Sequence, residues 1–367
     1  MWVQPGSSSQ ATAPPAQRPA AAPRVDHPTR PAPPHQPVVP VAPPATAARP
    51  VAPLAPLAPP TIFHEPWWLE RATGGAVEMA EVRSGGRLVA WMPYRVSRRR
   101  GFRVSVQPHL THLLGPVIDP GTGSGNNQWL HRIDAMEELA GRLPDLALFS
   151  QTCHPGLRDV LGFQARGFSA SVQYSAEIAP AAQDQLWRAM RDKTRNVIRK
   201  GEKSWRTTEL DDPGQFHRLY ADNLRHAGQR SYFDLGCVEP LVEAAQRRGQ
   251  ACIRAAIDER GVIGAAVLVV RDASRAWYLM STRHPGIADN GAVSLLVWRS
   301  IQDASRRGLV FDFDGISSEG TARFYAGFGA TMCPRFSVTR VSPGYQLATS
   351  ALAWMRGRST RNPFTAH

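Results

Sequence analysis

Two aspartates at the end of one apolar segment are candidates for acid–base chemistry. The segment Phe311–Gly315 reads Phe-Asp-Phe-Asp-Gly. An extended strand sends alternate side chains to opposite faces, so Asp312 and Asp314 are predicted to share one face. Two neighbouring carboxylates can shift each other's pKa and serve as a general base, and they can equally form structural ion pairs with arginine. We favour Asp312 as the catalytic carboxylate, with Asp314 beside it.

A basic segment offers a surface for an anionic ligand. The spacing of apolar residues predicts one helix from Gln183 to Trp205. All three lysines of the chain fall within this segment, and five basic residues share one stripe of the helix: Arg188, Arg191, Arg195, Arg199 and Lys203. Such a stripe can bind a phosphate-rich donor or an acidic acceptor, and it is also typical of a solvated helix face. The candidate substrate-binding residues are Arg195, Asn196, Arg199 and Lys200.

Small residues at the start of a later helix form a third candidate. Asn290, Gly291 and Ala292 begin a helix predicted at about Ala292–Arg307. The N-terminus of a helix presents free N–H groups and the positive end of the helix dipole, and both favour a bound phosphate. The loop Gly121–Gly125 precedes an earlier helix and is a weaker candidate of the same kind.

The chain as a whole is basic and begins with a segment of unusual composition. The first 60 of its 367 residues contain 18 of the 32 prolines. Such a segment buries too little surface to fold, so residues 1–60 are predicted to be a disordered Pro/Ala-rich tail. The formal net charge of +13 favours anionic partners such as nucleic acid, a phosphorylated cofactor or an anionic lipid surface.

Several classes of protein are disfavoured. The four cysteines lie apart without a CxxC pair, which argues against a disulfide framework or a zinc ribbon, and no metal is expected because no residues have metal-ligand spacing. No run of about 18 apolar residues indicates a transmembrane helix, and the N-terminus lacks the pattern of a secretory signal. We therefore expect a cytoplasmic protein without integral membrane association, and the oligomeric state stays open.

The order of predicted elements repeats along the chain. From Ser169 onward it is strand, helices, three strands, helix, strand, short helix and strand, and the region from Val77 to Glu177 follows this order without the opening strand and helices. Trp129 and Trp298 fall in corresponding helices, 169 residues apart. We infer two tandem copies of one α/β module, a truncated one at 61–168 and a complete one at 169–342, followed by a basic C-terminal tail at 343–367.

This element order is that of the GNAT acyltransferase fold, and in its tandem arrangement the chain resembles the FemAB-like acyltransferases. The resemblance covers about Ile62–Val341 and is most specific in three segments: Lys193–Lys200, Phe311–Gly315 and Phe324–Ala330. It implies an α/β (α+β) fold of two tandem GNAT-like modules, with mixed, mostly antiparallel sheets flanked by helices. The group includes peptidoglycan aminoacyl transferases and acyltransferases linked to polysaccharide synthesis.

The resemblance also implies roles for individual residues. In GNAT enzymes the loop before the central helix cradles the pyrophosphate of coenzyme A, and Asn290–Ala292 occupy that place here. A tyrosine at the position of Tyr325 often protonates the leaving thiolate. His226 and Arg230 lie in the helix and loop that shape the acceptor side of this fold.

Together these features predict an N-acyltransferase that moves an acyl group from acyl-coenzyme A to an amine of a sugar, peptide or cell-envelope precursor. An aminoacyl-tRNA-dependent FemAB-type peptidoglycan transferase is the first alternative. It is less favoured because no heptad run predicts the coiled-coil arm that such enzymes often carry. A non-catalytic nucleic-acid-binding or scaffold protein is an alternative of another class. A membrane-surface role is suggested only by the end of the chain, with Trp354, Met355, Arg356, Arg358 and Arg361.

Overall fold

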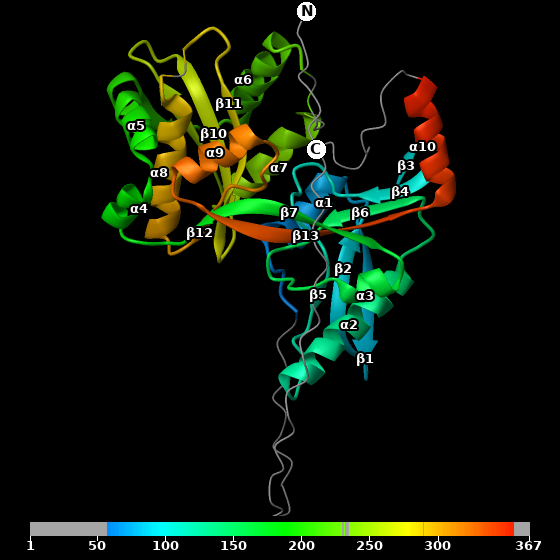
Figure 1. Cartoon of the computed structure of the whole chain (residues 1–367). Helices are drawn as coiled ribbons and strands as arrows, with labels where there is room; N and C mark the ends of the chain where they lie inside the picture. The colour runs from blue at the N-terminus through cyan, green and yellow to red at the C-terminus, as the bar shows by residue number, and fades with distance from the viewer. Residues whose placement is uncertain (1–56, 230, 232–234, 289, 356–367) are drawn as a thin grey trace, which may run out of the picture. The chain divides into compact units, whose positions relative to one another are not determined.

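The computed structural model describes residues 57–229, 231, 235–288 and 290–355. Most of the predicted tail (1–60) lies outside these residues, as do Arg230 and residues 356–367. The fold within the described chain is of the mixed α/β class that the sequence predicts (Figure 1).

The first half of the described chain contains six strands, three α-helices and one short 3-10 helix. They are η1 (Ile62–His64), α1 (Pro66–Thr73), β1 (Glu78–Ser84), β2 (Arg87–Tyr94), β3 (Ser97–Arg99), β4 (Phe102–Val106), β5 (Val117–Ile118), α2 (Gly125–Arg142), β6 (Leu148–Thr152) and α3 (Leu161–Ala165).

The second half alternates helices with longer strands. Its elements are β7 (Ser169–Ile178), α4 (Gln183–Ala189), α5 (Asp192–Ser204), β8 (Arg206–Glu209), α6 (Pro213–His226), α7 (Leu235–Arg247), β9 (Ala251–Ile257), β10 (Ile263–Arg271), β11 (Arg275–Arg283), α8 (Ala292–Arg306), β12 (Val310–Asp312), α9 (Glu319–Gly327), β13 (Thr331–Val341) and α10 (Pro343–Met355).

A ten-stranded sheet runs through both halves in the order β3-β4-β6-β13-β7-β12-β11-β10-β9-β8, and β1, β2 and β5 form a separate three-stranded sheet. The long strands β7 and β13 lie at the middle of the large sheet and pair antiparallel from Ser169↔Thr339 to Glu177↔Thr331 (Figure 1). Within the described residues of this sheet, only the pairs β4–β6 and β11–β12 are parallel. The sheet is therefore mixed and mostly antiparallel, as predicted.

Alternation of side chains along the central strands divides the core between the two faces of the sheet. On one face, Trp277 of β11 packs with Phe63, Trp68 and the buried residues of α6 and α7. On the other face, Phe311 and Phe313 pack with Tyr325 and the buried residues of α4, α5 and α8. Adjacent residues such as Trp277 and Tyr278 therefore belong to different cores, because successive side chains on a strand point to opposite faces.

The predicted single helix from Gln183 to Trp205 is wrong, because the chain forms two helices. The backbone is extended at Met190 (ψ 150°) and Arg191 (ψ 145°), which ends α4 at Ala189 and starts α5 at Asp192. Met190 is buried in the core between α4 and α8, and burying this apolar side chain stabilises the break. The basic residues on either side of residue 190 therefore do not form one continuous stripe.

The segment after β13 differs from the predicted basic tail in its first half, because residues Pro343–Met355 form the helix α10. Tyr345 is buried and its ring meets Phe102 of β4 edge to face, with the centroids 5.2 Å apart. This contact holds α10 against the β3–β4 end of the large sheet (Figure 1).

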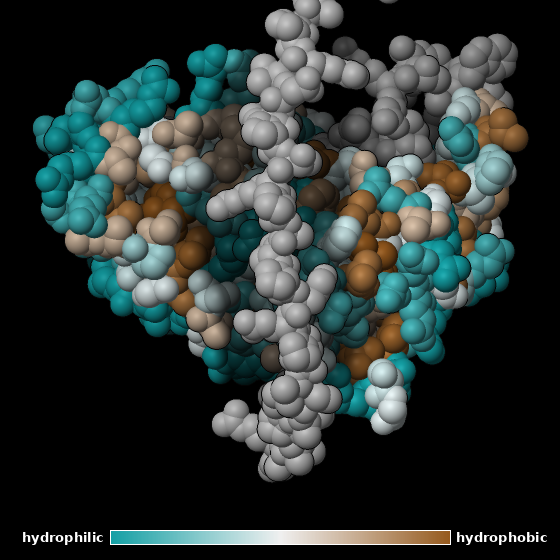
Figure 2. Space-filling view, turned by 60° about the horizontal axis from the view of Figure 1, so that its bottom comes forward, coloured by the Kyte–Doolittle hydropathy of each residue, from teal (hydrophilic) through white to brown (hydrophobic). Residues whose placement is uncertain are grey.

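None of the helices described is both long and apolar enough to cross a membrane. Some large apolar side chains are nevertheless exposed, among them Trp129, Leu130, Met332 and Leu347. Figure 2 shows one face of the molecule, on which apolar patches lie among hydrophilic surface. Scattered apolar exposure is normal for folded proteins, so it does not locate a functional site by itself.

Candidate active site

The parallel strands β11 and β12 separate after a short paired stretch, and we call this point the fork. β12 pairs with β11 only from Arg275↔Val310 to Trp277↔Asp312, whereas β11 continues to Arg283. Beyond Asp312 the chain turns toward β7, where the Phe313 N–H donates to the Ala176 carbonyl at 2.9 Å. Within the described residues, the Tyr278–Arg283 part of β11 therefore has no partner strand on the β12 side.

Tyr325 of α9 lies beside the fork on one face of the sheet. Its ring stacks on Phe313 with centroids 4.3 Å apart and meets Tyr278 edge to face at 6.4 Å. Burial raises the pKa of Tyr325, and Tyr278 and the Asp312 carboxylate raise it further. Burial likewise raises the pKa of Tyr278 to about 12. Both phenols therefore keep their protons at neutral pH and can act as hydrogen-bond donors.

Asp312 lies at the fork on the opposite face and is completely buried. One of its oxygens accepts from the Ser175 hydroxyl at 2.7 Å and from the Asp314 N–H at 2.9 Å. The other accepts from Arg275 at 3.2 Å and from Arg335. Its partners are thus two arginines outside the basic segment that the sequence singled out. Asp312 would have to give up one of these bonds to act as a base.

Asp314 is bound between two side chains from different parts of the chain. Its φ of 59° lies in the left-handed region, and its carboxylate accepts from Arg335 at 3.2 Å and pairs with Nδ1 of His112. His112 belongs to the loop between β4 and β5, and its ring stacks on Phe63 with centroids 5.8 Å apart. The side chain of His112 is 21% exposed, compared with 3% for Asp314. A carboxylate in this position holds an imidazole in one orientation and favours one tautomer.

His112, Arg335 and Arg275 were not among the candidates from the sequence. Arg335 is 23 residues from Asp312 and His112 is about 200 residues from Asp314 in the sequence, so no local spacing connects them. No local signal marked Arg335, because alternation along β13 places it on the same face as the polar residues Ser337 and Thr339. A buried arginine in such a place requires a carboxylate partner.

The predicted phosphate site at Asn290–Ala292 lies at the start of α8, where α5 packs closely. A Cβ on Gly291 would lie 2.3 Å from the Val197 carbonyl oxygen, and the φ of Gly291 is 88°. Glycine is therefore required here by the contact between α5 and α8. This contact brings the exposed residues Asn196 and Lys200, next to Val197 and Gly201, close to the exposed Asn290.

Arg195 and Arg199 have different surroundings, although both were predicted to bind substrate. Arg195 donates to the carbonyl oxygens of Met190 at 2.7 Å, Arg188 at 3.2 Å and Trp187 at 3.3 Å, and it also pairs with Asp192. Its guanidinium thus satisfies the last carbonyls of α4. Arg199 is exposed, bonds Asn196 at 2.9 Å and lies 5.5 Å from the ring centroid of Trp187.

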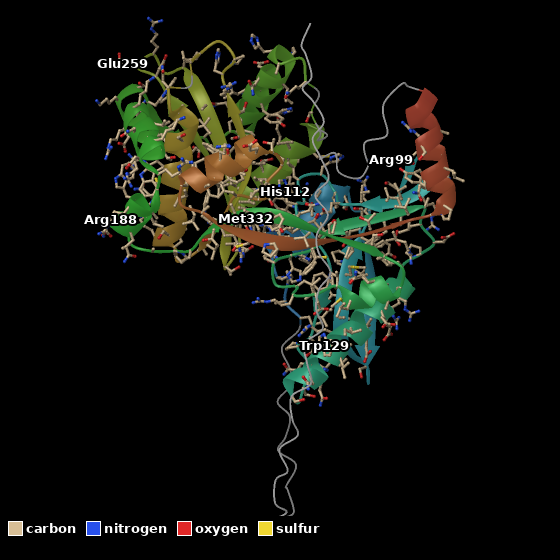
Figure 3. The ribbon with its side chains drawn as sticks, in the orientation of Figure 1. Arg99, His112, Trp129, Arg188, Glu259 and Met332 are labelled. Carbon is tan, nitrogen blue, oxygen red and sulfur yellow. The ribbon has the colours of Figure 1, made fainter. Side chains whose placement is uncertain are left out.

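The structure brings some predicted residues together and separates others. Asp312, Asp314 and Tyr325 meet at the fork, and the α8 start meets Asn196 and Lys200. His226 is exposed in the last turn of α6, and Arg230 lies outside the described residues. In Figure 3, His112 lies beside the central strands whereas Arg188 lies on the outer flank of the second half, so the two regions are distinct.

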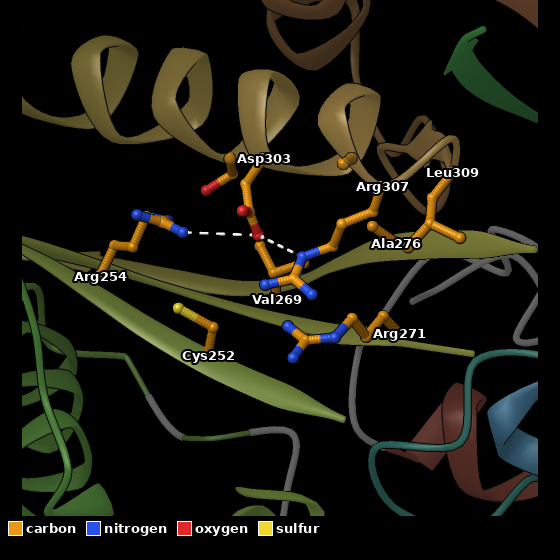
Figure 4. Close-up of a pocket in the computed structure, with 10 residues that line it drawn as sticks. Cys252, Arg254, Val269, Arg271, Ala276, Asp303, Arg307 and Leu309 are labelled. Atoms are coloured by element: carbon orange, nitrogen blue, oxygen red, sulfur yellow. Dashed lines mark hydrogen bonds and ion pairs between the residues drawn. The ribbon is translucent and has the colours of Figure 1, made fainter. Parts of the chain in front are cut away.

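A small surface pocket lies elsewhere, between β9, β10 and the end of α8 (Figure 4). Asp303 in its wall accepts from Arg307 at 3.1 Å and pairs with Arg254 at 3.5 Å. Burial opposes ionisation of Asp303, but the arginines outweigh it and lower the pKa of the carboxyl. Because Asp303 is shared by Arg254, Arg306 and Arg307 near the end of α8, we interpret the pocket as a structural ion cluster with a net positive charge. Among the described residues no group of three or more His, Cys, Asp or Glu side chains could hold a metal ion.

Comparison with known structures agrees with this architecture. The crystal structure of FemX superposes with a TM-score of 0.56 at 14% identity, covering 76% of this chain and 92% of FemX. The C-terminal domain of a putative lysylphosphatidylglycerol synthetase from Agrobacterium fabrum gives 0.52 at 15% identity, covering 78% of this chain and 96% of that domain. At these identities the likeness establishes the fold. Among curated proteins, none matches the chain.

Residues 188–326 match the family model described as an acetyltransferase (GNAT) domain. The match begins in α4, includes the fork and ends in α9, next to Tyr325. It confirms the resemblance predicted from the sequence for this part of the chain. Residues 188–326 are thus similar to an acetyltransferase (GNAT) domain, within a fold that the chain shares with FemX.

Proposed function

We propose that this chain is an N-acyltransferase that transfers an acyl group from acyl-coenzyme A to an amine at the fork between β11 and β12. The observation that carries the proposal is the placement of two proton-handling groups on opposite faces of the fork. Tyr325 lies on one face, and the His112–Asp314 pair lies on the other. A reaction centre between them would have a donor for the leaving group and a base for the attacking amine.

The unpaired part of β11 supports binding of the donor. A strand edge presents N–H and C=O groups that an extended chain of amides can pair with, in the manner of an added strand. The pantetheine arm of coenzyme A contains such amides. The start of α8, with Asn290 and the exposed Asn196 and Lys200 of α5 nearby, is suited to the phosphates. Arg199 stays a proposed contact for the same anionic group.

Tyr325 is the proposed donor to the leaving sulfur. When the thioester C–S bond breaks, negative charge develops on a sulfur whose thiol has an ordinary pKa of ~8.5. Burial raises the pKa of Tyr325 far above that value, so full transfer of the phenolic proton to the thiolate is unfavourable. A hydrogen bond from Tyr325 that strengthens as the charge develops is the more favourable contribution.

His112 is the proposed base, with Asp314 as its positioning residue. An amine is mostly an ammonium ion at neutral pH and must lose a proton before its lone pair can attack the acyl carbon. With Nδ1 held by Asp314, the proton would go to Nε2, which is a buried atom, so the amine must enter the fork to reach it. Asp312 is then better suited to hold Arg335 and Arg275 than to accept a proton itself.

An envelope component is the proposed source of the amine. Two structures that share the fold are FemX and a putative lysylphosphatidylglycerol synthetase domain, and the net charge of +13 suits an acceptor or donor that carries phosphate. The amine of an amino sugar, peptide or cell-envelope precursor therefore stays the proposed acceptor, with the reaction placed in the cytoplasm where acyl-coenzyme A is available.

Calorimetric titration of the full chain with coenzyme A, followed by an amine screen, tests the proposal. We expect saturable, near-stoichiometric binding, and release of free coenzyme A from acetyl-coenzyme A only when a suitable amine is present. Tyr325→Phe should keep coenzyme A affinity within about twofold and lower kcat by tenfold or more. Trp129→Phe, at an exposed position of α2 away from the fork, is a control that should leave kcat unchanged.

The same experiment separates the alternatives. If the chain does not bind coenzyme A but binds aminoacylated tRNA tightly and in a salt-sensitive way, aminoacyl-tRNA becomes the proposed donor. This result would favour the tRNA-dependent transferase. Binding of duplex DNA with no response to any acyl donor would favour a non-catalytic nucleic-acid-binding protein.

A further inference from the structure

The β3–β4 hairpin carries an exposed cluster of arginines at the edge of the large sheet. Its members, which we call the hairpin cluster, are Arg98 and Arg99 on β3, Arg100 in the turn and Arg103 on β4, and all four side chains are exposed. None of them forms an ion pair with another described residue. No acidic residue occurs in the sequence from 95 to 118, so no neighbouring residue along the chain neutralises the cluster.

Two members of the hairpin cluster face each other directly. Arg98 pairs with Arg103 across the antiparallel strands. Like charges in directly opposite positions destabilise a strand pair. The turn adds a further cost, because Arg100 has a φ of 53° and lies in the left-handed region. A group of charges that the fold itself disfavours indicates an anionic partner outside the protein.

Helix α10 lies beside this hairpin and differs sharply from it in character. It is held there by the contact between Tyr345 and Phe102, and none of its 13 residues is charged. Leu347 on this helix is 72% exposed. The sequence after the helix continues with Arg356, Arg358 and Arg361, and no acidic residue occurs from 320 to the C-terminus.

We propose that α10 and the adjacent end of the hairpin cluster, Arg99 and Arg100, together form a docking surface for an anionic lipid bilayer. The arginines would contact lipid phosphates, while Leu347 and the uncharged helix would enter the interfacial region. Interfacial binding combines burial of apolar side chains with attraction between basic residues and anionic lipids, and each arginine near the surface contributes about 1 kcal/mol. Figure 3 shows Arg99 beside α10, and the register places Arg99 opposite Phe102, on the hairpin face against which α10 packs. Arg98 and Arg103 extend from the other face of the hairpin.

Two other roles, protection of the sheet edge and binding of nucleic acid, each explain fewer features of this surface than binding of a bilayer does. Charged residues on an edge strand prevent unwanted pairing with another sheet, but this role does not account for the exposed leucine on the neighbouring helix. A nucleic-acid surface would use the arginines, but it would leave Leu347, an exposed aliphatic side chain on a helix without charged residues, without a role.

Vesicle co-sedimentation of the full chain tests this surface directly. We expect the protein to sediment with phosphatidylcholine vesicles that contain about 30% phosphatidylglycerol and to stay in solution with phosphatidylcholine alone. The triple variant Arg98→Gln, Arg99→Gln, Arg100→Gln should weaken binding to the anionic vesicles at least tenfold. Leu347→Ser should weaken it several-fold, with the loss persisting at high salt because it removes an apolar contribution.

A matched variant on the other side of the molecule provides the control. Arg188→Gln, Arg191→Gln, Lys193→Gln also removes three exposed positive charges, on and beside α4 and α5, and should leave vesicle binding unchanged. Equal losses from both triple variants would show a general effect of net charge and overturn the proposal. Vesicle binding that is unaffected by the hairpin variant, or duplex DNA binding that depends on the hairpin in the absence of vesicle binding, would overturn it as well. Coenzyme A binding is a separate readout, so failure here leaves the proposed activity untouched.

Discussion

Arg335 on β13 is bonded to Asp312 at the end of β12, and both side chains are buried. The same guanidinium reaches Asp314 at 3.2 Å, so one arginine binds both aspartates of the segment Phe311–Gly315. Because Asp314 also pairs with His112, the arginine links β13 to the loop between β4 and β5. The fork is therefore held in shape by charges that come from both halves of the chain.

Replacing Arg335 with methionine should destabilise the protein strongly. The variant leaves two buried carboxylates without their shared partner, and breaking a buried ion pair in this way costs about 3–5 kcal/mol. For a chain of this size, the melting temperature should fall by roughly 6–10 °C. Arg323→Met breaks an exposed pair with Glu319 and should cost less than about 1 kcal/mol. Similar melting temperatures for the two variants would contradict the structural role of Arg335.

Whether the sequence alone predicts a residue of this site depends on how far apart along the chain the contacting residues lie. The carboxylates Asp312 and Asp314, the aromatic alternation and Tyr325 all follow from local patterns, and the structure does bring these residues together. His112 and Arg335 act through contacts between distant segments, and a single sequence contains no spacing that reveals such contacts. The break at Met190 was missed for a related reason, since only tertiary burial of that side chain decides it.

Gly291→Ala should disturb the contact between α5 and α8. The added Cβ would meet the Val197 carbonyl oxygen at 2.3 Å, in addition to the strain of a positive φ. Gly308→Ala is the matched control, because its φ is 71° and a Cβ there meets nothing within 4 Å. We expect a cost of about 1 kcal/mol for Gly308→Ala and at least twice that for Gly291→Ala, measured by thermal unfolding. Equal costs would show that α5 can move away from α8 without penalty.

Replacing Arg195 and replacing Arg199 should have different effects on stability and on ligand affinity. Arg195→Ala removes the donor to three carbonyls at the end of α4, and the loss of bonds to a charged group should cost about 2 kcal/mol. Arg199→Ala removes an exposed side chain and should cost less than about 1 kcal/mol. If Arg199 contacts the anionic donor, its variant should weaken coenzyme A binding about tenfold without a change in melting temperature. A large stability loss in Arg199→Ala, or none in Arg195→Ala, would reverse this assignment.

Acidification should destabilise the protein through a buried histidine. His64 in η1 is fully buried, and burial, together with the nearby His154, lowers the pKa of His64 to about 3. Burial also lowers the pKa of His154. An unfolded chain has a histidine pKa of ~6.5. Since the folded value lies below the unfolded one, the neutral form stabilises the fold above pH ~6.5, and this contribution is lost as the pH falls from ~6.5 toward 3.

The expected loss for His64 alone is up to about 5 kcal/mol over the whole window, at about 1.4 kcal/mol for each pH unit. Melting temperatures measured between pH 8 and pH 4 check this slope. His64→Asn keeps a polar atom near Thr61, which bonds the His64 ring at 2.9 Å, and should flatten the slope even though its smaller side chain lowers stability at every pH. His226→Asn, at an exposed position, should keep the slope of the natural chain. An unchanged slope in His64→Asn would mean that groups other than this histidine control acid unfolding.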